Sequence, residues 1–147
     1  MEVGDISFTL VHPRYLDLVW PRVGPCLERA TDTSGGRFSL DSVRVDILNF
    51  QQLLWVLFRG DDDLLVSATT QFVFYPLRKN LCVMFMGTSD HGERLWLRHR
   101  DLVVGALEDF AREHGCDGIE LTGRVGWDRV LSKFGFEKKF IVLEKDL

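Results

Sequence analysis

The run Leu81–Met86 is the feature that most constrains the fold, because every residue in it is apolar. A strand with apolar side chains on both faces has to be covered on both faces, so this run predicts an interior strand of a sheet with helices on either side. Leu53–Phe58 is a second run of the same kind. Both are far shorter than the roughly 20 residues of a membrane-spanning helix. The two runs therefore favour a buried sheet over a membrane segment.

Strand-like and helix-like patterns alternate along the whole chain, which predicts an α/β or α+β fold with a mixed sheet covered by helices, in a single domain spanning 1–147. The expected strands are Ile6–Val11, Leu53–Phe58, Leu65–Tyr75, Leu81–Met86, Ile119–Thr122 and Lys139–Glu144. The expected helices are a kinked or split helix ending near Thr31, and helices at about Leu40–Asn49, Arg100–His114 and Trp127–Phe134. The polar segment Gly87–Arg98 is expected to be a loop.

Four positions predict where helices begin, bend and end. Pro21 and Pro25 each remove a backbone donor, so the first helix is expected to kink or split there. Ser39 is typical of a helix N-cap. Gly115 is typical of the residue that ends a helix.

Charge and cysteine usage exclude several classes of function. The 147 residues carry 18 basic and 22 acidic side chains, a net charge of −4, and a dedicated nucleic-acid binder would show a basic excess instead. The acidic N-terminus has no positive region, which argues against a secretory signal. The three cysteines show no metal-binding spacing. We therefore expect a cytoplasmic protein with free thiols and no metal site.

The order of elements along almost the whole chain, together with the C-terminal third, resembles the GNAT superfamily of N-acetyltransferases. Lys133–Glu137 followed by Phe140–Lys145 is similar to that superfamily's last helix, Gly-Phe turn and final strand. Ala111–Gly115 followed by Ile119 is similar to the end of its long central helix and its fifth strand. The resemblance implies a mostly antiparallel sheet of six or seven strands flanked by about four helices.

A narrower resemblance is to a GNAT-like family of tailed phages. It is carried by Gly36-Arg37, Leu54–Val56, Tyr75-Pro76, Gly115-Cys116 and Gly123–Leu131. This resemblance implies a protein of the virion or of its assembly pathway, located in the host cytoplasm or in the particle.

The acetyl-CoA motif of the superfamily is altered in this chain. The superfamily binds the pyrophosphate with Q/R-x-x-G-x-G/A at a helix start, where glycines allow close backbone approach. That motif falls on Leu95–Arg100, and both glycine positions hold arginine, Arg98 and Arg100. With Arg94, these side chains are the candidates for contacting phosphate by charge alone. A shifted loop that uses Gly92 is the alternative.

The acid and base positions of the superfamily are altered as well. The tyrosine that protonates the leaving thiolate corresponds to Leu131, which has no proton to give. No carboxylate lies on Leu81–Met86, where the general base is often found. Glu120 is the weak catalytic candidate, with Asp90 and Glu93 as other substitutes.

Three side chains near Gly123 form a candidate partner-binding patch: Arg124, Trp127 and Arg129. Arginine and tryptophan are enriched at interface hot spots, although a tryptophan that begins a short helix also serves as a core anchor. The basic and aromatic residues of Arg94–Arg100 are typical either of stacking on nucleic acid or of a solvated loop over Trp96.

The sequence thus favours a non-catalytic GNAT-like protein with a degenerate acetyl-CoA site. Its expected partners are other proteins, including virion or assembly proteins or a second copy of itself, with no membrane and no nucleic acid. The alternative is an N-acyltransferase that uses acetyl-CoA through an atypical cofactor loop. A third hypothesis is a binder of small molecules or nucleic acid through Arg124 and Trp127.

Overall fold

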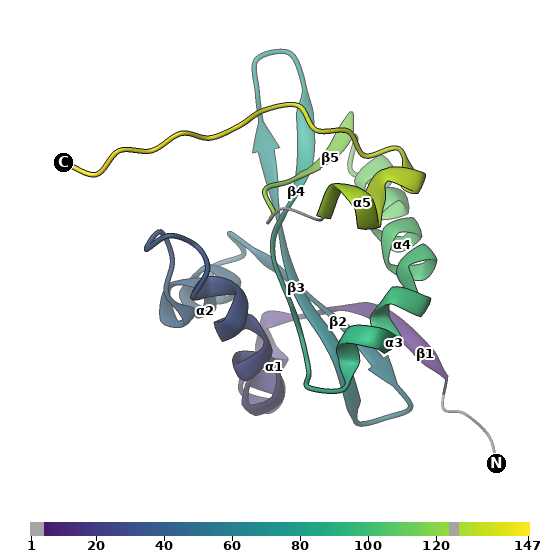
Figure 1. Cartoon of the computed structure of the whole chain (residues 1–147). Coiled ribbons are helices and arrows are strands. Elements are labelled where there is room, and N and C mark those ends of the chain that lie inside the picture. The colour runs from purple at the N-terminus through teal and green to yellow at the C-terminus, as the bar shows by residue number, and fades with distance from the viewer. Residues whose placement is uncertain (1–4, 124–126) are drawn as a thin grey trace.

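A computed structural model describes residues 5–123 and 127–147 as a five-stranded sheet with helices on both faces (Figure 1). The strands lie in the order β1 (Ile6–Val11), β2 (Leu53–Arg59), β3 (Asp63–Phe74), β4 (Lys79–Thr88) and β5 (Gly118–Leu121). The first four strands pair antiparallel with their neighbours, and β5 pairs parallel to β4. The prediction of an interior strand at Leu81–Met86 is confirmed, because β4 has a strand on each side.

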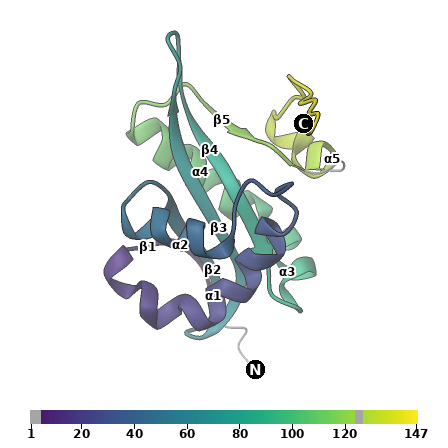
Figure 2. The ribbon, with the colours of Figure 1, turned by 90° about the vertical axis from the view of Figure 1, so that its left-hand side faces the viewer.

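Helices cover both faces of this sheet (Figures 1 and 2). The first face carries the 3-10 helix η1 (Pro13–Tyr15), α1 (Leu16–Thr31) and α2 (Leu40–Leu48). The second carries α3 (Gly92–Arg98), α4 (Arg100–Glu113) and α5 (Trp127–Leu131), which continues into η2 (Ser132–Phe134). The predicted mixed, mostly antiparallel α/β fold is confirmed.

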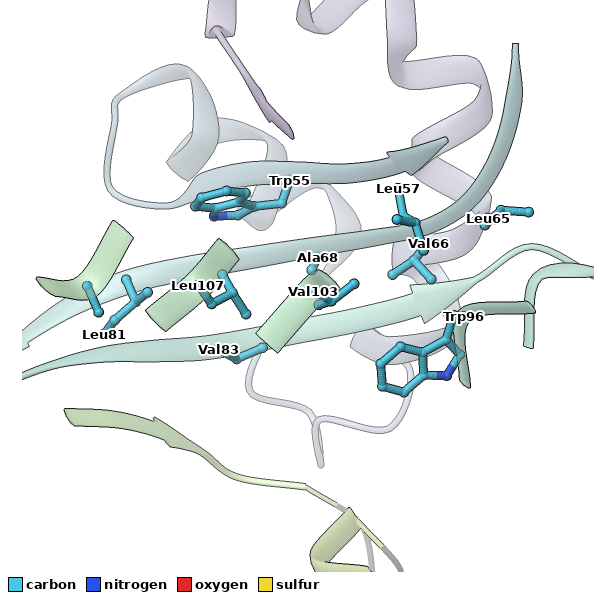
Figure 3. Packing of buried hydrophobic residues seen from close by; sticks show 11 residues of the cluster. Trp55, Leu57, Leu65, Val66, Ala68, Leu81, Val83, Trp96, Val103 and Leu107 are labelled. Carbon is cyan, nitrogen blue, oxygen red and sulfur yellow. The ribbon is translucent and has the colours of Figure 1, made fainter. Parts of the chain in front are cut away.

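Each face has its own hydrophobic core. On the α4 face, Trp55 of β2, Ala68 of β3 and Val83 of β4 meet Val103 and Leu107 (Figure 3). The core under α1 and α2 consists of Leu16, Val23, Cys26, Leu27, Val43, Ile47, Leu54, Val56, Leu64 and Phe85. The sheet is therefore buried on both sides, as its apolar strands require.

The first helix tolerates its two prolines and is continuous from Leu16 to Thr31. A split helix, one of the two forms that the sequence predicted, is therefore not observed. Pro21 and Pro25 lie on the exposed side of α1, where water can bond to the carbonyls that lose a helical donor. The buried side of the same helix carries Val23 and Leu27.

The predicted helix ends agree with the structure. The side chain of Ser39 accepts a hydrogen bond from the amide of Ser42, whose own side chain bonds back to the amide of Ser39. This reciprocal cap fixes the start of α2. Gly115 and Gly135 follow α4 and η2 with φ of 70° and 88°, a conformation that glycine adopts without a steric penalty.

Two predicted elements are wrong. Lys139–Glu144 forms no strand, so the sheet has five strands and not six or seven. An apolar run becomes a strand only when another strand bonds to it, and this segment runs from η2 outside the sheet (Figures 1 and 2). Gly87–Arg98 is not all loop, because α3 begins at Gly92 and buries Trp96.

No helix within the described residues is long and apolar enough to cross a membrane.

Candidate functional site

β4 and β5 run together for only part of their length and then separate. Their pairing extends from Asn80↔Gly118 to Val83↔Leu121, while β4 continues to Thr88. Among the described residues, the separation leaves one edge of β4 without a strand neighbour beyond Val83. The two strands therefore leave an opening between them.

A β-bulge lies at the point where the two strands separate. Thr70 of β3 pairs with Val83 and Thr69 pairs with Phe85, so Met84 is an extra residue on β4. The bulge reverses the alternation of side chains. Val83 therefore packs on the α4 face, and Phe85 packs on the opposite face under α1.

A cleft of about 640 Å³ occupies this opening. Its apolar wall comes from both strands, both helical layers and the C-terminal segment. These lining residues include Val83, Met84, Phe85, Met86, Trp96, Val103, Val104, Leu107, Ile119, Leu121, Trp127, Leu131, Phe136 and Val142. The volume falls within the range of small-molecule sites.

Two opposite charges lie at the cleft. Arg37, in the loop between α1 and α2, forms an ion pair of 3.0 Å with Glu144 of the C-terminal segment. Both side chains are about half exposed, at 46% and 52%. Gly35 and Gly36 precede Arg37 with φ of 69° and 78°, so the loop turns sharply just before the arginine.

The region expected to bind pyrophosphate contains no glycine loop. Only His99 separates α3 from α4. Arg94 and Arg98 are exposed, whereas Arg100 is half-buried and donates hydrogen bonds to the carbonyls of Leu97 at 3.0 Å and Val130 at 3.1 Å. Arg100 thus ties α5 to the start of α4.

Gly92 has a packing role that the sequence did not indicate. A Cβ at Gly92 would lie 2.2 Å from the carbonyl oxygen of Leu65. The glycine therefore lets α3 begin directly against β3. Its backbone is covered by that contact, which weakens the alternative of a shifted phosphate loop at this position.

The three residues of the candidate partner-binding patch do not share one environment. Trp127 lines the cleft and its ring centroid lies 5.8 Å from that of Trp96. Arg129 is exposed on α5. Arg124 lies outside the described residues.

Glu120, the weak candidate for a catalytic base, belongs to a polar cluster. Its Oε1 accepts hydrogen bonds from the Tyr75 hydroxyl at 2.7 Å and from Asn80 Nδ2 at 3.0 Å. The bond to Glu120 raises the pKa of Tyr75. Glu120 alternates with Ile119 and Leu121 of β5, which line the cleft, and it is not among the lining residues itself. Of the other substitutes, Asp90 is paired with Arg29 and Glu93 is exposed.

The residues at the cleft offer little acid–base chemistry. Leu131, which the resemblance aligns with a tyrosine, lines the cleft and is buried. Burial and the nearby Glu120 carboxylate raise the pKa of Cys82 to about 11, so its thiol is protonated at neutral pH. Across the described residues, no group of three or more side chains could hold a metal ion.

The Arg37–Glu144 pair is the site feature that sequence reasoning missed. The two residues are separated by more than a hundred positions, and neither belongs to a motif that links it to the other. The double glycine before Arg37 was the available signal, since it predicts a turn but not what the following side chain contacts.

No family model matches the sequence, and no curated protein matches it. Solved structures match its fold over nearly the full length. A predicted acetyltransferase with acetyl-CoA from Clostridium acetobutylicum shares 14% identity, with 97% of this chain and 96% of that chain covered and a TM-score of 0.65. A GNAT family acetyltransferase from Staphylococcus aureus shares 12%, with 97% and 98% covered and a TM-score of 0.59.

A transcriptional regulator from Bacillus halodurans has the same architecture, at 16% identity, with 97% and 100% of the two chains covered and a TM-score of 0.66. Identities this low concern the fold alone. These matches, together with the mixed sheet and its helical layers, show that the chain has the GNAT fold.

Proposed function

We propose that this protein acts by binding a protein partner and does not transfer acyl groups. The observation that carries the proposal is Leu131, which lines the β4–β5 cleft at the position where the resemblance places a proton-donating tyrosine. A leucine side chain cannot protonate a leaving thiolate. The fold is then a scaffold kept without the acyl-transfer chemistry, since a fold by itself does not determine a function.

The other polar groups at the cleft support the same proposal. Within the described lining, the titratable side chains are Arg37, Cys82 and Glu144. Glu144 is paired with Arg37, and the Cys82 thiol has a pKa of about 11. The Cys82 thiol is therefore protonated at neutral pH, and the Glu144 carboxylate contacts a guanidinium.

The junction between α3 and α4 also supports a degenerate cofactor site. A pyrophosphate cradle needs backbone amides that a ligand can approach closely. Here Arg98, His99 and Arg100 carry side chains at that junction, and Arg100 is bonded to Val130. Arg94 and Arg98 remain the candidates for a weaker, charge-based contact with phosphate.

The β3–β4 hairpin supports a protein partner. It projects beyond the rest of the sheet (Figure 1), and its tip exposes Phe74 at 73%, Tyr75 at 44% and Leu77 at 96%. Aromatic and apolar side chains gathered on one exposed surface are typical of a contact site. With Trp127 and Arg129, they are the proposed contact residues. The phage-type resemblance places the partner in a virion or its assembly pathway, and this stays a prediction.

The second candidate is an N-acyltransferase that uses acetyl-CoA. Its support is the cleft itself, which opens between β4 and β5, and a neighbour of the same fold whose structure contains acetyl-CoA. In this function Arg94, Arg98 and Arg100 would hold the pyrophosphate and Glu120 or water would act as the base.

Thermal unfolding with and without millimolar acetyl-CoA separates the two functions. A ligand at roughly 100 times its Kd stabilises the folded state by about 2.7 kcal/mol, which for this chain length raises Tm by roughly 5–10 °C. We expect no such shift and no release of free CoA with a panel of amine acceptors. A shift with turnover contradicts the proposal and favours the acyltransferase.

A photo-crosslinking residue at Leu77 tests the partner. We expect a discrete protein adduct at Leu77, and none at a control position, Glu113, which is exposed at the end of α4. Equal labelling at the two positions would remove the hairpin as the contact site.

A further inference from the structure

We propose that the β4–β5 cleft binds a medium-chain fatty acid, with its hydrocarbon tail among the apolar side chains and its carboxylate on Arg37 in place of Glu144. This inference goes beyond the protein partner proposed above and does not depend on it. It rests on the lining of the cleft and on the charges at it.

The wall of the cleft suits a flexible hydrocarbon chain. Met84 and Met86 line it from β4, and Val104 and Leu107 line it from α4. Methionine side chains adapt their shape to a guest because they are unbranched and polarisable. An apolar wall with few polar groups selects for burial of methylenes rather than for a polar ring.

The positive charge of Arg37 at the cleft indicates the head group of the ligand. Arg37 is the single basic side chain among the described residues of the lining. Its guanidinium matches the geometry of a carboxylate, which it can bind through two parallel N–H donors. One arginine without a glycine cradle suits a monocarboxylate better than the diphosphate of a nucleotide cofactor.

Glu144 already places a carboxylate on Arg37 at 3.0 Å, and Val142 of the same segment lines the cleft. The C-terminal segment thus presents to the cleft the two chemical features of the proposed guest, an apolar group and a carboxylate. Because the Arg37–Glu144 pair is half exposed, it contributes little stability, on the order of 1 kcal/mol or less. A ligand carboxylate with a buried tail competes with it.

The neighbouring residues Phe140 to Leu143 reinforce this assignment. They are apolar and between 70% and 91% exposed, so the segment has few apolar contacts that resist its displacement by a guest. None of the described strands pairs with the segment. Its described ion pair to the rest of the chain is the one to Arg37.

Isothermal titration of the full chain with hexanoate, octanoate, decanoate and dodecanoate, each below its micelle concentration, tests the tail. Burial of one more methylene strengthens binding roughly fourfold. Successive acids in the series differ by two methylenes, so we expect binding to strengthen roughly fifteenfold per step until the cleft is full. An affinity that does not change with chain length, or no binding of dodecanoate, overturns the inference.

Variants at the two charges test the head group. Arg37→Gln is expected to weaken dodecanoate binding about five- to tenfold and to leave dodecanol binding unchanged. Glu144→Gln is expected to strengthen dodecanoate binding by up to about fivefold, because it removes the competing carboxylate. Arg29→Gln is the matched control: Arg29 is also exposed and paired, with Asp90, but does not line the cleft. Equal losses in the Arg29 and Arg37 variants overturn the carboxylate assignment.

Decanoyl-CoA separates failure of this inference from failure of the proposed function. Binding of decanoyl-CoA without any binding of decanoate overturns the fatty-acid inference and favours the acyltransferase. Binding of decanoate, with no CoA release from decanoyl-CoA, supports both proposals together.

Discussion

Gly87 of β4 lies directly beneath Cys26 of α1, so closely that a Cβ at Gly87 would stand 1.8 Å from the Cys26 carbonyl oxygen. This contact sets the distance between α1 and the sheet. It lies on β4, the strand whose residues also form one wall of the cleft. A backbone oxygen cannot rotate away as a side chain can. The absence of a side chain at this one position therefore determines how closely α1 packs on β4.

Gly87→Ala is expected to destabilise the protein by about 2–4 kcal/mol, because the methyl group overpacks a rigid contact and α1 has to shift. Chemical denaturation measured by circular dichroism gives the change. Gly105→Ala is the matched control, since a Cβ there meets nothing within 4 Å in the middle of α4. The control should stabilise the protein by about 0.5–1 kcal/mol. Similar effects of both substitutions would contradict this account of the contact.

Thr70→Val is expected to cost about 1–3 kcal/mol, because the indole N–H of Trp55 loses a buried acceptor 2.9 Å away. The neighbouring Thr69 supplies the control. It is equally buried, and its hydroxyl has no hydrogen-bond partner among the described residues. Thr69→Val should be neutral or stabilising, since it removes an unsatisfied polar atom. Denaturation midpoints of the two variants make the comparison, and a larger loss at Thr69 would refute it.

The lowered pKa of Asp63 predicts that the protein loses stability in acid. Burial alone would raise its pKa, but the hydrogen bonds from His91 and Arg59 outweigh burial and hold the pKa below the ordinary value of 3.8. The folded state then binds fewer protons than the unfolded state, so stability rises with pH across this window. The contribution is complete above the unfolded pKa and is lost as the pH falls through the folded pKa.

Unfolding free energies of wild type and Asp63→Asn, measured from roughly pH 2 to pH 7, give this contribution. That range spans the titration of carboxylates. The difference in unfolding free energy should be largest near neutral pH and shrink in acid. Asp62→Asn, at the turn residue just before Asp63 and without a side-chain ion pair in the described structure, is the control. A difference between wild type and Asp63→Asn that stays constant with pH would rule out the linkage.

Cys82 should react slowly with iodoacetamide at neutral pH. Burial, with the Glu120 carboxylate adding to it, raises its pKa to about 11, and only the thiolate is nucleophilic. Mass spectrometry should show a labelling rate that climbs about tenfold per pH unit without levelling off below roughly pH 10, whereas the rate for a free cysteine peptide levels off above its pKa of about 8.5. A plateau near pH 9 would show that the thiol is not perturbed.

The sequence by itself determined the elements whose signals are local. The apolar runs at Leu53–Phe58 and Leu81–Met86 predicted buried strands, and Ser39 and Gly115 marked helix ends, all in agreement with the structure. These features depend on side-chain periodicity and on backbone conformations that are preferred residue by residue. The GNAT resemblance of the C-terminal third pointed to the fold that the structure has.

Tertiary structure alone decided the last strand and the site. Phe140–Leu143 has the composition of a strand, yet a strand requires a bonded neighbour, and none of the described strands pairs with it. The ion pair between Arg37 and Glu144 joins residues more than a hundred positions apart. The cleft exists because β5 leaves β4 after Val83. Contacts between distant segments depend on how the layers pack. The side-chain periodicity of a few consecutive residues does not predict that packing.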